Sequence, residues 1–218
     1  MKLISFFIAV LLGGSFLPAQ EVDPVLTAIK SRMDSIVAFE ASVEMEVDIS
    51  FVTMPVKEAE ISYVKGEPIA ITSEDFVMIP KRGLDLTLNE LYRYPFMTLS
   101  LGKVQLQGRE CDLIKIIPTT EASDFSIASV WVDRETLHVL KSQISTKKNG
   151  VYDIFYTYQA EEDPLPSEIR VEFEVSGVKI PLRFLGRDTQ IDKDKKDQDP
   201  QERGAIYLRL AHRGLTLL

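Results

Sequence analysis

The stretch Phe39–Phe51, FEASVEMEVDISF, decides the fold because apolar and polar residues alternate along all of it. Its apolar set comprises Phe39, Ala41, Val43, Met45, Val47, Ile49 and Phe51. A period of two indicates a β-strand with one face toward water and the other toward an apolar interior. A strand this long exceeds the usual length and favours the wall of a curved antiparallel sheet or barrel.

The segment before this strand predicts an amphipathic helix. In DPVLTAIKSRMDSI, residues 23–36, Asp23 suits the N-cap and Pro24 suits the first helical position. Apolar residues then recur at helical spacing: Val25, Leu26, Ile29, Met33 and Ile36. An apolar stripe needs an apolar partner, so we expect this helix to cover the sheet that follows.

Further strands are predicted downstream, separated by turn residues. They are expected at Ala59–Val64, Asp75–Ile79, Val104–Leu106, Cys111–Ile117, Ile127–Asp133, Leu137–Ser145, Val151–Tyr158 and Ile169–Val175. The turn KKNG ends in Asn149 and Gly150, which tolerate positive φ. Consecutive hairpins of this kind form an antiparallel meander.

Three other segments have their own patterns. Residues 86–95, LTLNELYRYP, are expected to form a short helix across the sheet. Residues 188–203 are almost wholly charged and polar and predict a solvated or disordered loop. Residues 204–218 return to strand composition and should rejoin the same sheet. Trp131 lies within a predicted strand and can face either side of the wall.

The N-terminus predicts export. Residues 1–19 combine Lys2, an apolar run and a small residue at the end, as a secretory signal peptide does. Residues 20–218 are then one soluble periplasmic domain. The formal net charge of −8 argues against nucleic acid as a partner.

Catalytic motifs are missing from the sequence. His138, His212 and Cys111 stand at no metal-ligand spacing, and there is no phosphate loop or nucleophile motif. Cys111, the single cysteine, is expected to be a small apolar core residue. We therefore expect no catalytic residue, no metal, no cofactor and no enzymatic activity.

Two stretches carry a family resemblance: IKSRMDSIVAFEASVEMEVDISF at 29–51 and VWVDRETLHVLKSQISTKKNGVYDIFYTY at 130–158. Helix, long strand and triple-strand meander in this order resemble the carriers and receptors of the bacterial lipoprotein-localisation system (LolA/LolB type). Their divergent relatives, described as outer-membrane lipoprotein-sorting proteins, are the nearest in pattern. The resemblance spans most of the chain after residue 19.

The resemblance implies a mainly β fold with some helix. It is an unclosed antiparallel barrel, or half-barrel, covered by the N-terminal helix and one or more short helices, with an apolar cavity for acyl chains. The cover would contain Leu26, Ile29 and Met33. The wall would contain Phe39, Val43, Met45, Val47, Ile49, Phe51, Ile154, Tyr156, Val171 and Phe173. A carboxylate introduced at Met45 should then be buried and unpaired.

The resemblance implies a periplasmic carrier that shields acyl chains of lipoproteins or other lipids during sorting to the outer membrane. Its expected partners are an acylated lipoprotein or lipid and membrane-bound release and acceptor proteins, and the chain is expected to be a monomer. Two alternatives stay open. One is a non-enzymatic envelope sensor or protein-interaction module on the same fold, and the other is a hydrolase with an unfamiliar site using His138 or His212.

Overall fold

A computed structural model describes residues 22–74, 93–174, 188–196 and 203–218. Its elements are α1 Pro24–Asp34, β1 Ile36–Asp48, β2 Val52–Thr53, β3 Lys57–Val64, β4 Ala70–Thr72, β5 Phe96–Leu106, β6 Arg109–Pro118, β7 Phe125–Asp133, β8 His138–Thr146, β9 Val151–Thr157, β10 Glu168–Glu174, β11 Gln190–Ile191, α4 Lys193–Lys196 and β12 Arg203–Leu217. Ten of these strands form one antiparallel sheet in the order β4-β3-β1-β12-β10-β9-β8-β7-β6-β5. Within the described residues β4 and β5 are the two edges, so the barrel is unclosed, as predicted.

The helix α1 forms where the sequence predicts it. The Asp23 side chain accepts a hydrogen bond of 2.9 Å from the Val25 amide, and Pro24 occupies the first turn with its φ already fixed. Val25, Leu26 and Ile29 are buried. The prediction placed Ile36 on the same helical stripe, which is wrong, because α1 ends at Asp34 and Ile36 is the first residue of β1.

The long strand β1 confirms the alternation. Ala41 and Val43 are buried, whereas Glu40 and Glu44 are exposed. The strand does not continue to Phe51 as predicted, because the chain turns after Asp48 and Ile49 forms an isolated bridge with Val52. Apolar alternation therefore extends past the hydrogen-bonded strand, since Ile49 and Phe51 are still buried in the core.

The strands β5 to β10 form the predicted meander, each paired with its neighbour in sequence. Gly108 and Gly150 have φ of 82° and 78° and lie in the turns after β5 and β8. Gly150 supplies the left-handed conformation of the KKNG turn. The strand β5 is much longer than the predicted Val104–Leu106, because a bulge at residues 100–103 interrupts the alternation on which the prediction relied.

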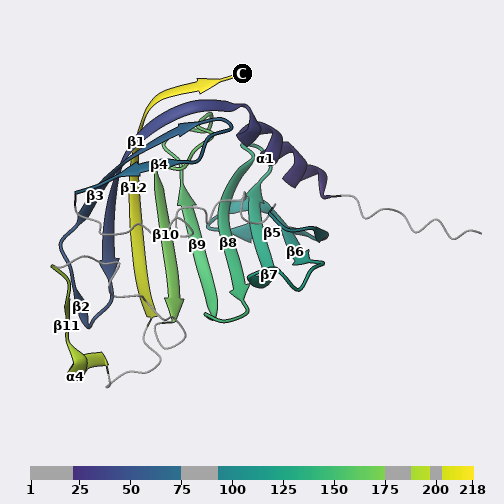
Figure 1. Ribbon diagram of the computed structural model, residues 1–218. Helices are drawn as coiled ribbons and strands as arrows, with labels where there is room; N and C mark the ends of the chain where they lie inside the picture. Colours follow the sequence, from purple (N-terminus) through teal and green to yellow (C-terminus); the bar gives the residue numbers. More distant parts are fainter. Residues whose placement is uncertain (1–21, 75–92, 175–187, 197–202) are drawn as a thin grey trace, which may run out of the picture.

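The last strand rejoins the sheet as predicted, since β12 pairs with β1 on one side and with β10 on the other. The charged segment 188–203 is not wholly a loop. Gln190 and Ile191 form β11, which pairs with Thr53 and Val52 of β2, and the short helix α4 follows. This small sheet lies beside one end of the large sheet (Figure 1).

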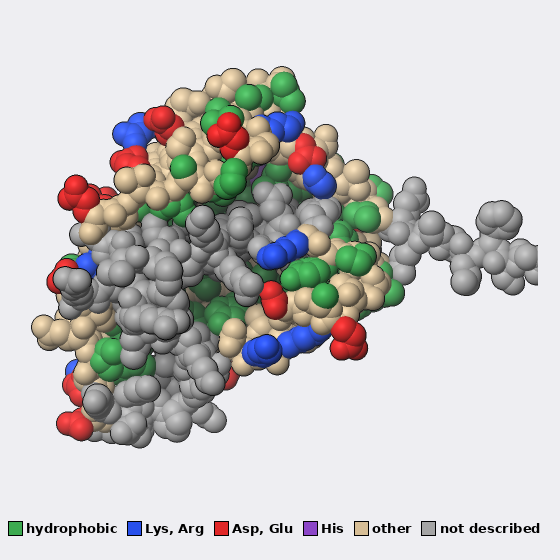
Figure 2. All heavy atoms as spheres, in the orientation of Figure 1, with side chains coloured by type: hydrophobic (Ala, Val, Ile, Leu, Met, Phe, Trp, Pro, Cys, Tyr) green, Lys and Arg blue, Asp and Glu red, His purple; other side chains and the backbone are tan. Residues whose placement is uncertain are grey.

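The large sheet curves strongly, and α1 packs near one end of its inner, concave face (Figure 1). One core cluster joins α1 to strands near both edges, because Leu26, Ile61 of β3 and Ile116 of β6 all belong to it. In Figure 2 hydrophobic side chains are visible inside this hollow, while charged side chains are found mainly around the outer rim. None of the helices in the described parts is long and apolar enough to cross a membrane.

Some predictions lie outside the described residues. These are the signal peptide at 1–19, the strand at Asp75–Ile79 and most of the short helix at 86–95. In the described end of that segment, residue 93 is a turn, residue 94 a bend and residue 95 irregular, so no helix is present at 93–95.

Candidate functional site

The concave face collects the residues that the sequence assigned to a binding cavity. Eight of the thirteen are buried in the core cluster: Leu26, Ile29, Val43, Ile49, Phe51, Ile154, Val171 and Phe173. The other five are partly buried and pack against it: Met33, Phe39, Met45, Val47 and Tyr156. The structure therefore brings all thirteen into one hydrophobic cluster, formed by α1 and the inner side of the sheet.

An aromatic group lies at the end of this cluster where β1 begins. The ring of Phe39 stacks on Tyr63 of β3 at a centroid distance of 5.3 Å, and His212 of β12 meets Phe39 edge-on at 5.7 Å. The imidazole Nε2 of His212 lies 2.9 Å from the Pro166 carbonyl oxygen, so it donates a hydrogen bond to the backbone. His212 is thus held as a structural group.

Polar contacts connect α1 to the sheet and its loops. The Asp23 amide donates to Thr98 Oγ1 of β5 at 3.0 Å. At the other end of the helix, the guanidinium of Arg32 donates to the Thr136 carbonyl at 2.5 Å and to the Glu162 carbonyl at 2.7 Å. Arg32 therefore joins α1 to the β7–β8 turn and to the segment after β9.

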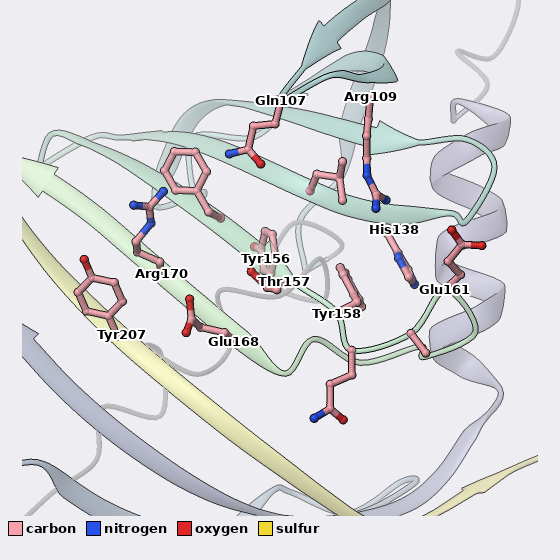
Figure 3. A pocket seen from close by; sticks show the side chains of 14 residues that line it. Gln107, Arg109, His138, Tyr156, Thr157, Tyr158, Glu161, Glu168, Arg170 and Tyr207 are labelled. Carbon is pink, nitrogen blue, oxygen red and sulfur yellow. The ribbon is translucent and has the colours of Figure 1, made fainter.

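A pocket of about 410 Å³ lies in a different place (Figure 3). Its lining residues are Gln107, Arg109, His138, Leu140, Phe155, Tyr156, Thr157, Tyr158, Gln159, Ala160, Glu161, Glu168, Arg170 and Tyr207. Phe155 and Arg170 alternate along their strands with the core residues Ile154 and Val171, so they project from the outer face of the sheet. Only Tyr156 belongs both to this pocket and to the thirteen predicted residues.

Two tyrosines and a histidine are among the residues that line the pocket. Burial raises the pKa of Tyr156 to about 12, and burial likewise raises the pKa of Tyr158, whose hydroxyl donates to the Val139 carbonyl. His138 is 3% exposed, and its Nε2 lies 2.8 Å from the Asp163 carbonyl oxygen. At neutral pH both phenols stay protonated, so they act as neutral polar groups and not as bases.

Cations and aromatic rings alternate on the outer face beside the pocket. Lys141 Nζ lies 5.1 Å from the ring centroid of Trp131 and 5.0 Å from that of Phe155, and Arg170 lies 4.4 Å from Phe155. Trp131 therefore faces outward, which settles the choice that the sequence left open. The four side chains are directly opposite one another in register across β7, β8, β9 and β10.

The same outer face holds a stabilised carboxylate in the neighbouring row, where Asp153 lies opposite Gln143. Burial alone would raise the pKa of Asp153, but hydrogen bonds from Lys141 and Gln143 hold it below its ordinary value. Lys141 Nζ is 2.9 Å from Asp153 Oδ1, and Arg203 is 3.2 Å from Oδ2. Lys141 and Arg203 are therefore already paired with a carboxylate.

The histidine and cysteine side chains of the described residues are engaged in structural roles. His138 and His212 both bind backbone carbonyls, and in the described parts no group of three His, Cys, Asp or Glu side chains gathers into a metal site. Burial raises the pKa of the Cys111 thiol, which keeps it protonated. What the geometry provides is an apolar surface on one face and a polar, aromatic pocket on the other.

The pocket was missed by sequence reasoning because its residues come from five separate segments. A weak signal was present in the strand residues between the core positions: Trp131, Phe155 and Tyr207 are aromatic where an outward face would ordinarily carry small polar side chains. Their common surface follows from the strand order, which places β12 beside β10.

Comparisons with known proteins bear on the fold. No family model and no curated protein sequence matches this chain. Among solved structures, a domain from Vibrio parahaemolyticus described as an outer membrane lipoprotein-sorting protein superposes with a TM-score of 0.52 at 10% identity, over 87% of this chain and 90% of that one. A LolA superfamily protein from Nitrosomonas europaea gives a TM-score of 0.49 at 10% identity, covering 88% and 93% of the two chains.

A DUF1329 family protein from Desulfovibrio piger gives a TM-score of 0.46 at 11% identity, over 87% of this chain and 90% of that one. The strand order and α1 define the architecture as an unclosed antiparallel half-barrel with an N-terminal helix. The Vibrio parahaemolyticus domain has a similar fold. The resemblance inferred from the sequence is confirmed at the level of the fold.

Proposed function

We propose that this protein binds acyl chains of lipids or lipoproteins on the concave face of its sheet and carries them across the cell envelope, in sorting to the outer membrane. The observation that carries the proposal is the single hydrophobic cluster that contains Leu26 of α1, Val43 of β1 and Ile154 of β9. Each methylene group buried there gains about 0.8 kcal/mol. A long chain can therefore be held by burial alone.

The strongest argument for a ligand comes from the half-buried members of this cluster, because they still expose apolar area to water. Phe39, Met45 and Val47 pack against the core but keep part of their surface exposed. An acyl chain laid against them would remove that remaining apolar surface from water.

The helix α1 is suited to act as the movable cover. It is anchored by three buried apolar side chains and by polar contacts at its two ends, through Asp23 and Arg32. The strands of the sheet are held by continuous ladders of hydrogen bonds. Elements with fewer contacts open at lower free energy, so α1 is the part that would move to admit a chain.

The remaining expectations belong to the same proposal. Residues 1–19 act as an export signal, residues 20–218 form one periplasmic domain, and the monomer exchanges an acylated lipoprotein or lipid with membrane-bound release and acceptor proteins. The apolar ligand itself requires no cofactor and no catalytic residue.

The test is to express the full chain in a bacterium with two membranes, purify the protein from the periplasmic fraction and extract it for mass spectrometry. We expect acyl lipids or lipoprotein fragments in about a one-to-one ratio with the protein. The matched control is Glu44→Gln, which alters an exposed residue beside Val43 and should leave the ratio unchanged. A protein that carries no lipid and takes up none when offered would overturn the proposal.

A second candidate is a protein-interaction module, favoured by the pocket on the outer face. Arg170, Phe155 and Tyr207 line a surface that the concave face does not use. Under this alternative, Tyr207→Ala would abolish capture of an envelope protein by the purified chain, while acyl lipid would be absent from the preparation. Lipid in the preparation and no effect of Tyr207→Ala would favour the carrier.

A further inference from the structure

A lysine is buried on the concave face. Lys57, the first residue of β3, is 1% exposed and is the largest fully buried residue in the part of the chain that the structure describes. Along β3 the residues Ala59 and Ile61 are buried and Glu58 and Glu60 are exposed, so Lys57 shares the face of the core residues. Lysine is almost never fully buried unless it has a partner.

The Lys57 ammonium is weakly compensated. Its Nζ lies 3.3 Å from Oδ2 of Asp188, and the side chain of Asp188 is 72% exposed. Within the described residues this is the single partner of a group that has three N–H donors. A buried charge with one long contact to a solvated carboxylate retains most of its desolvation cost.

An apolar row begins directly beside Lys57. Lys57 is opposite Met45 on β1, Met45 is opposite Leu208 on β12, Leu208 is opposite Ile169 on β10, and Ile169 is opposite Tyr156 on β9. Adjacent strands lie about 4.8 Å apart, so the row extends roughly 19 Å from the ammonium. One leaflet of a bilayer core measures about 15 Å, which is the reach of a lipid acyl chain.

We propose that Lys57 binds the anionic headgroup, a carboxylate or a phosphate, of an amphiphile whose acyl chain lies along the row from Met45 to Tyr156. The headgroup takes the place of the exposed Asp188 carboxylate as counter-ion. This inference rests on the proposed function and adds the class of cargo to it. Among ligands with the same chain, those with an acidic head bind more tightly than neutral ones.

The test uses the delipidated full chain and displacement of a neutral fluorescent probe, N-phenyl-1-naphthylamine, by three ligands with the same oleoyl chain: oleate, 1-oleoyl lysophosphatidate and monooleoylglycerol. We expect the two acidic ligands to bind about tenfold or more tightly than the glyceride. The tighter of the two acidic ligands identifies the source of the headgroup.

Substitutions then assign the effect to Lys57. Lys57→Met keeps the length and removes the charge, and it should weaken oleate about tenfold while changing monooleoylglycerol by less than about twofold. Asp188→Asn removes the competing carboxylate and should strengthen oleate binding, which tests the site even if Lys57→Met does not fold. Lys103→Met, at an exposed lysine paired with Glu110, is the matched control and should change nothing.

Two outcomes separate this inference from the proposed function. If all three ligands bind equally and Lys57→Met affects them alike, the headgroup site is refuted while the carrier stands. If none of the ligands displaces the probe from the wild-type chain, the proposed function fails and the headgroup site fails with it.

Discussion

His138 and Tyr158 lie face to face, with ring centroids 3.7 Å apart and planes inclined by only 2°. The stack lines the outer pocket. It lies next to the β7–β8 turn and the segment after β9, whose backbone carbonyls accept hydrogen bonds from Arg32 of α1. Burial lowers the pKa of His138, and the nearby guanidinium groups of Arg32 and Arg109 lower it further. The hydrogen bond with the Asp163 carbonyl and the charge of Asp133 act in the opposite direction and do not reverse the shift.

The pKa of His138 predicts a loss of stability in acid. The folded protein favours neutral imidazole, whereas the unfolded chain titrates at its ordinary pKa of about 6.5. The stability contributed by neutral His138 is therefore present above that value and declines as the pH falls below it. Urea unfolding at pH 7.5 and at pH 5 should show a lower free energy of unfolding at the lower pH.

His138→Gln should remove this part of the pH dependence, because glutamine does not titrate. His212→Gln is the control for losing a histidine hydrogen bond to a backbone carbonyl, since His212 binds Pro166 in that way. If His138→Gln and the wild type lose the same free energy between pH 7.5 and pH 5, buried His138 is not the source.

Arg32→Ala should loosen α1 without unfolding the sheet. The substitution removes two hydrogen bonds that the charged guanidinium donates to the carbonyls of Thr136 and Glu162. Because the bond to Glu162 is exposed to solvent, the two together should contribute about 1 to 3 kcal/mol. Hydrogen exchange should become faster over Pro24–Asp34, with little change in β7 and β8. Ser31→Ala, at the adjacent exposed position, is the control. Equal exchange in both variants would show that Arg32 does not hold the helix.

The elements defined by local periodicity were predictable from the sequence. The alternation around Val43 and the helical spacing of Leu26 and Ile29 each reflect a single buried face, and the structure has both elements in place. The packing of the helix on the strand was predictable too. The apolar stripe of the helix and the apolar face of the strand that follows it are both buried when the two elements pack together.

Features that depend on the order of the strands were not predictable. The predicted strand began at Ala59, so it left out the buried Lys57, although Lys57 has the same parity as Ala59 and Ile61. The outer pocket requires β12 to insert between β1 and β10, and no local pattern in residues 203–217 encodes that position. Long-range pairing, and not periodicity, assembles both sites.

Cys111 should be unreactive in the native protein. Its side chain is fully buried, and burial raises the pKa of the thiol, so the thiolate that reacts with alkylating agents is scarce. Iodoacetamide at pH 8 should label Cys111 only as fast as the protein unfolds, and urea should accelerate labelling to the rate of a free thiol. Rapid labelling in the absence of urea would contradict the burial of Cys111.

An aspartate substituted on the inner face of β1 is the most direct test of which face of the strand is buried. The structure changes the position at which this substitution should be made. Met45 was the choice from the sequence, where an aspartate was expected to be unpaired. The structure places the buried Lys57 directly opposite Met45, so we now expect an aspartate at this position to pair with the lysine.

Val43 is the better position, since it is 4% exposed and lies between Ala59 and Leu210. Val43→Asp should cost about 3 to 5 kcal/mol, because it buries an uncompensated charge. Glu44→Gln, at the neighbouring exposed position, should change the free energy of unfolding by less than about 0.5 kcal/mol. Chemical denaturation of the two variants and of Met45→Asp measures all three. Since only the aspartate opposite Lys57 has a cation to meet, Met45→Asp should be less destabilising than Val43→Asp, and the reverse order would mean that the two strands do not pair in this register.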